Sequence, residues 1–271
     1  IEAQRDFVTK QRDQIALQNT IMTDSIEYAK RIQTALLPQE KFMKKVLSDY
    51  FVFMKPKNIV SGDFYWVSEK NNKVIIVVAD CTGHGVPGAF MSMLGVAFLN
   101  EIVNKNDILE PDQILSQLRT SIIESLHQEY GILGSKDGMD LALCIIDNAA
   151  LKLKYAGAYN PCIIIRNNEI YELQPDKMPI GIHAVKVDKE FTNKDFDLQK
   201  DDIIYLFTDG YIDQFGGETG QKYRQKPFRE LLLKIASKDM SKQKEMLEKT
   251  MKKWQADRSQ LDDMMIMGIK I

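Results

Sequence analysis

Residues 74–85 read VIIVVADCTGHG, and this stretch decides how the chain folds. The apolar, mostly β-branched run from 74 to 79 predicts a buried strand. Asp80 ends the run, and the glycines at 83 and 85 favour a tight loop directly after it. A carboxylate at the end of a buried strand is unfavourable unless it is paired, hydrogen-bonded or bound to metal. The stretch therefore predicts a core strand that delivers Asp80 to a polar site.

Outward from this stretch, groups of short strands alternate with pairs of helices. Strands are expected at 50–55, 63–68, 74–79, 141–146, 152–158, 162–166, 169–173, 203–208 and 264–271. Helices are expected at 1–37, 86–103, 111–129, 227–237 and 241–254. The Asn71-Asn72 and Asn167-Asn168 pairs predict tight hairpin turns, and hairpins imply antiparallel pairing. We expect an α+β fold of two antiparallel sheets with helices outside them, because a doubly wound parallel sheet would not contain such hairpins.

The first 37 residues lack Pro and Gly and predict one helix, which Pro38 ends. Apolar residues recur every seven positions; they are Ile1, Val8, Ile15, Met22, Ala29 and Leu36. The second heptad position is polar at Arg5, Arg12 and Asn19 and apolar at Ile26, so the stripe is narrow for a coiled coil. Two interpretations stay open: a weak parallel dimer seam, or a helix that folds back onto its own domain. We assign 1–45 as a helical linker and 46–271 as the globular domain.

Composition excludes several classes of protein. The 271 residues are 44% hydrophobic and 27% charged with a net charge of −2, which is ordinary for a soluble domain and gives no bulk attraction for nucleic acid or anionic lipid. The sequence contains no run of about 18 apolar residues, so we do not expect direct membrane insertion. Cys81, Cys144 and Cys162 lack disulfide or zinc spacing, so we expect reduced thiols and a cytoplasmic protein. The chain begins at Ile1 rather than Met and has no leader sequence, which suggests a fragment of a longer protein.

Four aspartates lie beside small residues at strand ends: Asp63, Asp80, Asp209 and Asp262. A single Asp-Gly at a strand end, such as Asp209-Gly210, is most simply a turn, but four such sites together indicate shared chemistry. Oxygen ligands without His or Cys at zinc spacing favour Mg²⁺ or Mn²⁺. Two such ions about 4 Å apart can activate water and stabilise an in-line phosphoryl displacement. The sequence therefore predicts a phosphate-hydrolysing metal site.

Six segments, in this order, resemble the metal-dependent type 2C protein phosphatases, and specifically their bacterial SpoIIE-type branch. They are GDFYWV (62–67), ADCTGHGVPGAFMS (79–92), YAGAYNP (155–161), MPIGI (178–182), YLFTDG (205–210) and DDMM (262–265). The resemblance covers about residues 48–271 and implies an α/β/β/α sandwich with two metal ions at one end. It implies that Asp80 bridges the ions and that Asp63 and the Cys81 carbonyl serve one of them. Asp209 and Asp262 would hold the other ion, and a water between the ions would be the nucleophile.

The chain departs from the family pattern in three ways: His84 follows Asp80 by four positions, whereas type 2C enzymes outside this branch place a histidine nearer; Tyr159 replaces a usual His, and Met265 replaces a usual Thr. Neither substitution removes a carboxylate. Two roles stay open for His84: it could transfer a proton, or it could shape the turn. His127 and His183 are expected to be packing or surface residues. Lys55 and Lys57 are weighed between phosphate contacts and solvated side chains. Asp137 and Asp140 are weighed as ligands of a third, weaker metal ion, and the backbone amides near Gly85 as phosphate donors.

By resemblance, we expect a protein serine/threonine phosphatase that acts on a signalling protein, such as an anti-sigma-factor antagonist. The N-terminal helix would link an upstream sensor domain to the phosphatase, form a homodimer and control metal occupancy. One alternative is a non-catalytic dimerising module of the same fold, which the four intact carboxylates argue against. A second alternative is a metal hydrolase of small phosphoesters, although no P-loop or GxGxxG before a helix is present.

Overall fold

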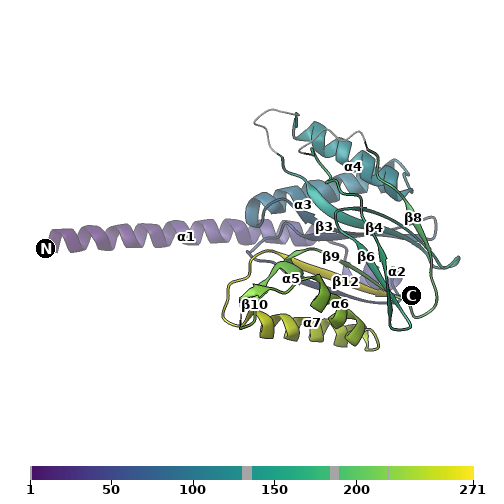
Figure 1. Ribbon diagram of the computed structural model, residues 1–271. Coiled ribbons are helices and arrows are strands. Elements are labelled where there is room, and N and C mark those ends of the chain that lie inside the picture. Colours follow the sequence, from purple (N-terminus) through teal and green to yellow (C-terminus); the bar gives the residue numbers. More distant parts are fainter. Residues whose placement is uncertain (1, 130–135, 184–188, 219) are drawn as a thin grey trace.

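The computed structural model describes residues 2–129, 136–183, 189–218 and 220–271. Two five-stranded antiparallel sheets pack face to face, and helices cover their outer faces (Figure 1). The predicted α+β sandwich is therefore confirmed.

The first sheet has the strand order β1-β12-β9-β6-β7. Its strands are β1 (Asp49–Lys55), β12 (Met264–Lys270), β9 (Ile203–Phe207), β6 (Cys162–Arg166) and β7 (Glu169–Leu173). The last strand of the chain, β12, pairs with β1 on one side and with β9 on the other. The start of β12 therefore lies beside the ends of β1 and β9.

The second sheet has the strand order β2-β3-β4-β5-β8. Its strands are β2 (Phe64–Lys70), β3 (Lys73–Cys81), β4 (Met139–Asp147), β5 (Lys152–Ala158) and β8 (Lys194–Asp197). Asn71 and Asn72, between β2 and β3, both have positive φ, at 51° and 60°. This conformation matches the twist of the paired strands, so the predicted hairpin turn is confirmed.

Helices form the two outer layers. The helices α3 (Gly85–Leu99) and α4 (Pro111–Ser125), with the π-helical segment η1 (Asn100–Lys105) between them, cover the second sheet. The helices α5 (Gly210–Asp213), α6 (Gln225–Ile235) and α7 (Met240–Gln255) cover the first sheet. A small hairpin of β10 (Phe215–Gly216) and β11 (Gln221–Lys222) contacts α7.

The strand β3 shows why residues 74–79 are apolar at every position. Its odd-numbered side chains, Ile75 and Val77, pack in the layer between the sheet and helices α3 and α4. Its even-numbered side chains, Ile76 and Val78, pack in the layer between the two sheets. Because successive strand side chains point to opposite faces, a strand with both faces covered must be apolar throughout.

At the N-terminus, α1 (Glu2–Leu36) extends away from the domain, while α2 (Glu40–Val46) packs on it (Figure 1). The side chains of Met43, Val46 and Leu47 are buried in the layer between the sheets. These buried contacts begin before residue 46, so a truncation designed to remove the linker alone should keep α2. The division at residue 45 stays a prediction.

The continuous helix of α3 and η1, Gly85–Lys105, is long and apolar enough by composition to cross a membrane. This finding differs from the expectation that no segment would meet that criterion. Half of the apolar stretch within this helix is buried inside the domain, where it packs against the second sheet. Burial against a sheet explains the apolar composition without a membrane.

Candidate active site

The four predicted aspartates come together at one end of the sandwich. Asp80 is the penultimate residue of β3, and Asp63 directly precedes β2, whose first residue pairs with Ala79. Asp209 follows the end of β9, and Asp262 precedes the start of β12, which pairs with that end. The antiparallel register in each sheet therefore brings two aspartates to the same end, and β3 contacts β9 and β12 across the interface between the sheets.

A cleft of about 250 Å³ opens between the two sheets at this end. Asp80, Asp209 and Asp262 line it, together with Asp140, which pairs with Asp80 in the β3–β4 register. Asp63 lies beneath the surface at 2% exposure.

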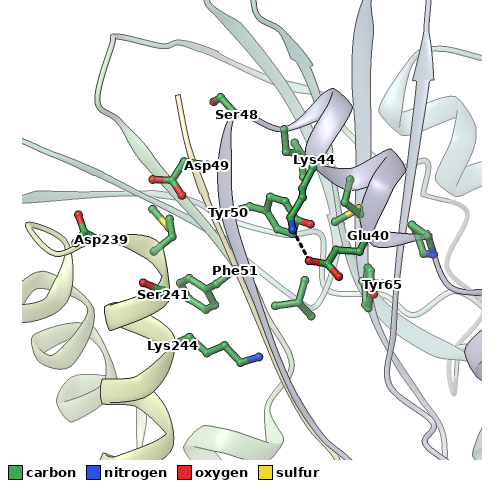
Figure 2. A pocket seen from close by; sticks show the side chains of 15 residues that line it. Glu40, Lys44, Ser48, Asp49, Tyr50, Phe51, Tyr65, Asp239, Ser241 and Lys244 are labelled. Atoms are coloured by element: carbon green, nitrogen blue, oxygen red, sulfur yellow. Dashed lines mark ion pairs between the residues drawn. The ribbon is translucent and has the colours of Figure 1, made fainter.

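A larger pocket, of about 540 Å³, lies elsewhere, between α2, β1 and the start of α7 (Figure 2). Figure 2 shows that its Glu40 and Lys44 side chains pair with each other, and their charged atoms are 2.6 Å apart. None of the four predicted aspartates lines this pocket. We therefore place the candidate active site by its chemistry rather than by cavity size.

Burial and mutual repulsion dominate the electrostatics of the cleft. Burial raises the pKa of Asp80 well above its usual value, and repulsion from Asp63, Asp209 and Asp262 raises it further. The pKa of Asp63 is also raised well above its usual value, first by burial, although a hydrogen bond from Thr208 lowers it. The pKa of Asp209 is raised by burial and by Asp213 and Asp262, and a hydrogen bond with Asp80 opposes this rise. Asp80 and Asp209, which line the same cleft, therefore lie close enough to influence each other's charge.

These carboxylates fit a cation. In the described parts of the chain, none of the four forms an ion pair with a Lys, Arg or His side chain. Carboxylates that are buried together without a basic partner favour either protonation or a bound metal ion.

No group of three or more His, Cys, Asp or Glu side chains within the described ranges converges closely enough to enclose an ion. Mg²⁺ in proteins keeps several water ligands, so a site for it does not need such a closed group. The assignment of Asp63, Asp80, Asp209, Asp262 and the Cys81 carbonyl as metal ligands stays a prediction.

Asp140, weighed as a ligand of a third metal ion, is part of the cleft. Burial and repulsion from Asp209 raise its pKa to about 7. Asp137 does not line the cleft, and its backbone carbonyl accepts a hydrogen bond from Gln128 at 2.5 Å. Of the described residues that line the cleft, Lys136 alone is basic. Lys136 was absent from the predicted site, because nothing in the sequence distinguishes it from other surface lysines.

His84 and Lys57 contact each other, since the Nε2 atom of His84 lies 2.7 Å from the Nζ atom of Lys57. The Nδ1 atom of His84 lies 2.8 Å from Oδ1 of Asn58. His84 thus joins the loop after β3 to the loop after β1, which favours the turn-shaping interpretation. Lys55 points elsewhere and donates to Gln255 on α7 at 2.9 Å.

Tyr159 and Met265, the two substitutions relative to the family pattern, have different surroundings. Tyr159 has a positive φ of 56°, is 40% exposed, and its hydroxyl lies 3.3 Å from Nε2 of His183. Met265 is buried between the sheets, and its backbone N–H donates to the Thr208 hydroxyl at 3.0 Å. That hydroxyl in turn donates to Oδ2 of Asp63 at 2.6 Å. His127 also has a positive φ, at the end of the turn that follows α4.

Two antiparallel sheets between helical layers, with buried aspartates at one end, define the class of metal-dependent type 2C phosphatase domains. The sequence profile of the Stage II sporulation protein E (SpoIIE) family matches residues 70–271. Because that match covers most of the chain, the chain belongs to the SpoIIE family.

Three known proteins illustrate the relationship. The SiaA-PP2C domain of Pseudomonas aeruginosa superposes with a TM-score of 0.84 at 30% sequence identity, covering 94% of this chain and 98% of that domain. Phosphoserine phosphatase RsbU of Bacillus subtilis is 27% identical over 192 residues, which are 68% of this chain and 52% of RsbU. The PP2C phosphatase domain of SpoIIE from Bacillus subtilis, with a fragment of its regulatory domain, shares the fold. Its TM-score is 0.66 at 17% identity, covering 82% of this chain and 63% of that structure. The chain thus spans about half the length of the curated relative that it matches.

Proposed function

We propose that this chain is the catalytic region of a metal-dependent protein serine/threonine phosphatase that hydrolyses phosphoserine or phosphothreonine on a signalling protein. The observation that carries the proposal is that Asp80, Asp209 and Asp262, from both sheets, line one cleft with Asp63 buried beside them, and that none of the four forms an ion pair within the described residues. Divalent ions held there, two Mn²⁺ or Mg²⁺ in our proposal, would supply Lewis acidity that activates water and offsets phosphate charge.

The residues of the cleft have distinct tasks in this proposal. Asp80 and Asp209 line the cleft together and would hold the metal ions, while Thr208 orients the Asp63 carboxylate by a 2.6 Å hydrogen bond. Lys136 and the backbone at the start of α3 offer positive charge to the phosphate. Burial raises the pKa of the Cys81 thiol well above its usual value, so this thiol is a poor nucleophile. In this proposal a water molecule attacks the phosphorus, the P–O bond to the serine or threonine oxygen breaks, and the released oxygen takes up a proton, so the protein need supply no covalent nucleophile.

A substrate panel tests this function and separates it from both alternatives. We expect Mn²⁺-dependent release of phosphate from phosphoserine and phosphothreonine proteins or peptides, and loss of release when a chelator removes the metal. Phosphate release from p-nitrophenyl phosphate but from no phosphoprotein or phosphopeptide would favour the small-ester hydrolase. Stable dimers without hydrolysis of any substrate would favour the non-catalytic module.

Two finer proposals follow from the resemblance to the SpoIIE-type branch. The substrate is a small phosphorylated protein of the anti-sigma-factor antagonist kind, and the enzyme works in the cytoplasm downstream of a sensor domain. The free, buried state of Cys81, Cys144 and Cys162 supports a reducing compartment.

We also propose that α1 forms a homodimer and regulates the site. Val8, Ile15 and Met22 on the heptad stripe are 58%, 57% and 61% exposed, so this stripe lacks a partner in the monomer. At its other end, α1 reaches the catalytic domain through Gln33, which is buried. Gln33 donates to the Ser61 carbonyl at 2.6 Å and accepts from the Ser61 N–H at 3.1 Å. Ser61 lies two residues before Asp63, so movement of α1 is transmitted to the backbone that carries this aspartate.

Replacing Ile15 and Met22 with Asp tests the dimer. We expect a shift from dimer to monomer in analytical ultracentrifugation, because the two charges would face each other across the seam. Unfolding of the catalytic domain should be unchanged, since both side chains are exposed in the monomer. The Mn²⁺ concentration for half-maximal activity should rise about tenfold, a coupling of typical allosteric size. Leu17→Asp, at a 61% exposed position off the stripe, is the matched control. A dimer that survives the double substitution would contradict the proposed seam.

A further inference from the structure

Asp263, next to the predicted ligand Asp262, uses both carboxylate oxygens inside the protein. Its Oδ1 accepts from the backbone N–H of Lys57 at 2.7 Å, and its Oδ2 accepts from that of Gly62 at 2.7 Å. The side chain is 3% exposed and does not line the cleft. The two donors lie at the two ends of the loop that joins β1 to Asp63. Asp263 therefore fixes this loop across a sequence separation of about 200 residues.

The loop that Asp263 holds is packed tightly against the turn after Asp80. A Cβ atom at Gly62 would lie 2.5 Å from the Gly83 carbonyl oxygen, which is too close for any side chain. Gly62 directly precedes Asp63, and Gly83 lies three residues after Asp80. The position of the Gly62 backbone therefore sets the distance between the Asp63 and Asp80 segments.

Asp263 also touches the segment of Asp209. A Cβ atom at Gly210 would lie 1.8 Å from the carbonyl oxygen of Asp263, so these backbones are in direct contact. The backbone N–H of Asp263 donates to Oδ1 of Asp262 at 2.8 Å. One residue thus contacts the segments of three predicted ligands.

We propose that Asp263 is a positioning residue of the metal centre, which holds the Asp63 loop in place without binding metal itself. This inference rests on the proposed function, because it assumes that Asp63 binds one of the ions. Without the carboxylate of Asp263, the N–H groups of Lys57 and Gly62 lose their acceptors and the loop can move away from Asp80. Asp63 would then lie too far from Asp80 for both carboxylates to bind the same metal ion.

The test measures equilibrium Mn²⁺ binding by calorimetry, independently of hydrolysis. We expect the wild type to bind Mn²⁺ at two sites. In Asp263→Ala, the affinity of the site that depends on Asp63 should fall by at least about tenfold, because loss of a residue that supports a metal ligand typically weakens metal binding by this amount. The other site should keep its affinity. In an Asp63→Asn background, Asp263→Ala should produce little further loss, because both changes act on the same site.

Two further variants separate positioning from general stability. Asp263→Asn keeps one acceptor oxygen and the shape of the side chain, so an intermediate affinity is expected, and it replaces the alanine variant if that one does not fold. Asp202→Asn changes another fully buried aspartate, which pairs with Arg166 at 2.6 Å far from the cleft. It should lower the melting temperature and leave Mn²⁺ affinity unchanged.

The outcomes distinguish this inference from the proposed function. Wild-type binding of two ions with unchanged affinity in both Asp263 variants would overturn the positioning role alone. Equal weakening of both sites by Asp263→Ala would also overturn it. A wild type that binds no Mn²⁺ would overturn the proposed function together with this inference.

Discussion

Asp80→Asn is expected to lower Mn²⁺-dependent hydrolysis of a phosphoserine peptide by at least about 10³-fold, the size of effect typical for removing a main electrostatic contact of a phosphoryl or acyl transfer site. The same change should make the metal-free protein more stable. Burial and the repulsion of Asp63, Asp209 and Asp262 all oppose the charge of Asp80, and a neutral amide removes this repulsion. The gain should be on the order of 1 kcal/mol in the free energy of unfolding.

Steady-state hydrolysis with Mn²⁺ and urea unfolding in EDTA measure the two effects separately. The opposite signs matter, because a variant that lost activity by misfolding would also lose stability. Asp197→Asn is the matched control, since Asp197 is exposed on β8 and pairs with Lys152, away from the cleft. Full activity in Asp80→Asn would contradict the proposed mechanism.

The stability of the metal-free protein is expected to fall as the pH rises from about 4 to about 7. Asp140 has a pKa raised from 3.8 to about 7, so between these values the folded state holds a proton that the unfolded state has released. A group with a raised folded pKa stabilises the protein below its unfolded pKa, and this stabilisation is lost as the pH passes the folded pKa. At 1.36 kcal/mol per pKa unit, Asp140 alone accounts for at most about 4 kcal/mol.

The raised pKa values of Asp63, Asp80 and Asp209 act in the same direction. Urea unfolding at a series of pH values in EDTA measures the slope. With saturating Mn²⁺ the slope should reverse, because metal binding requires the deprotonated carboxylates. Asp140→Asn should make the EDTA slope shallower. Stability in EDTA that rises between pH 4 and pH 7 would contradict the repulsive cluster.

Most of the fold followed from local patterns, because the core strands are long and apolar. The run at 74–79 and the two Asn-Asn turns predicted antiparallel pairing, and the register confirms it. Short elements were missed. The helix α2 has seven residues with three lysines among them, and β8 is the polar segment Lys194–Asp197 at a sheet edge. Neither carries a local signal, since each forms only because a neighbouring element packs against it.

The residues of the candidate site were likewise predicted only where a local pattern marked them. The aspartates were predicted because Asp80 and Asp209 come at or just after the end of an apolar strand and Asp63 and Asp262 precede the start of one. Asp263, Thr208 and Gln33 were not predicted, because their roles depend on partners far along the chain. Gln33 bonds to Ser61 28 residues away, and Asp263 bonds to Gly62 201 residues away. Only the folded arrangement brings such pairs together.

The place of β12 between β1 and β9 has a consequence for synthesis. A nascent chain emerges with Asp63, Asp80 and Asp209 long before Asp262, and its first sheet lacks an interior strand until residues 264–270 have left the ribosome. Until then β1 and β9 have no common neighbour, and Asp263 is not there to hold the Asp63 loop. The predicted metal ligands therefore cannot all take their places before residues 262–270 have emerged, so assembly of the candidate centre is tied to completion of the first sheet.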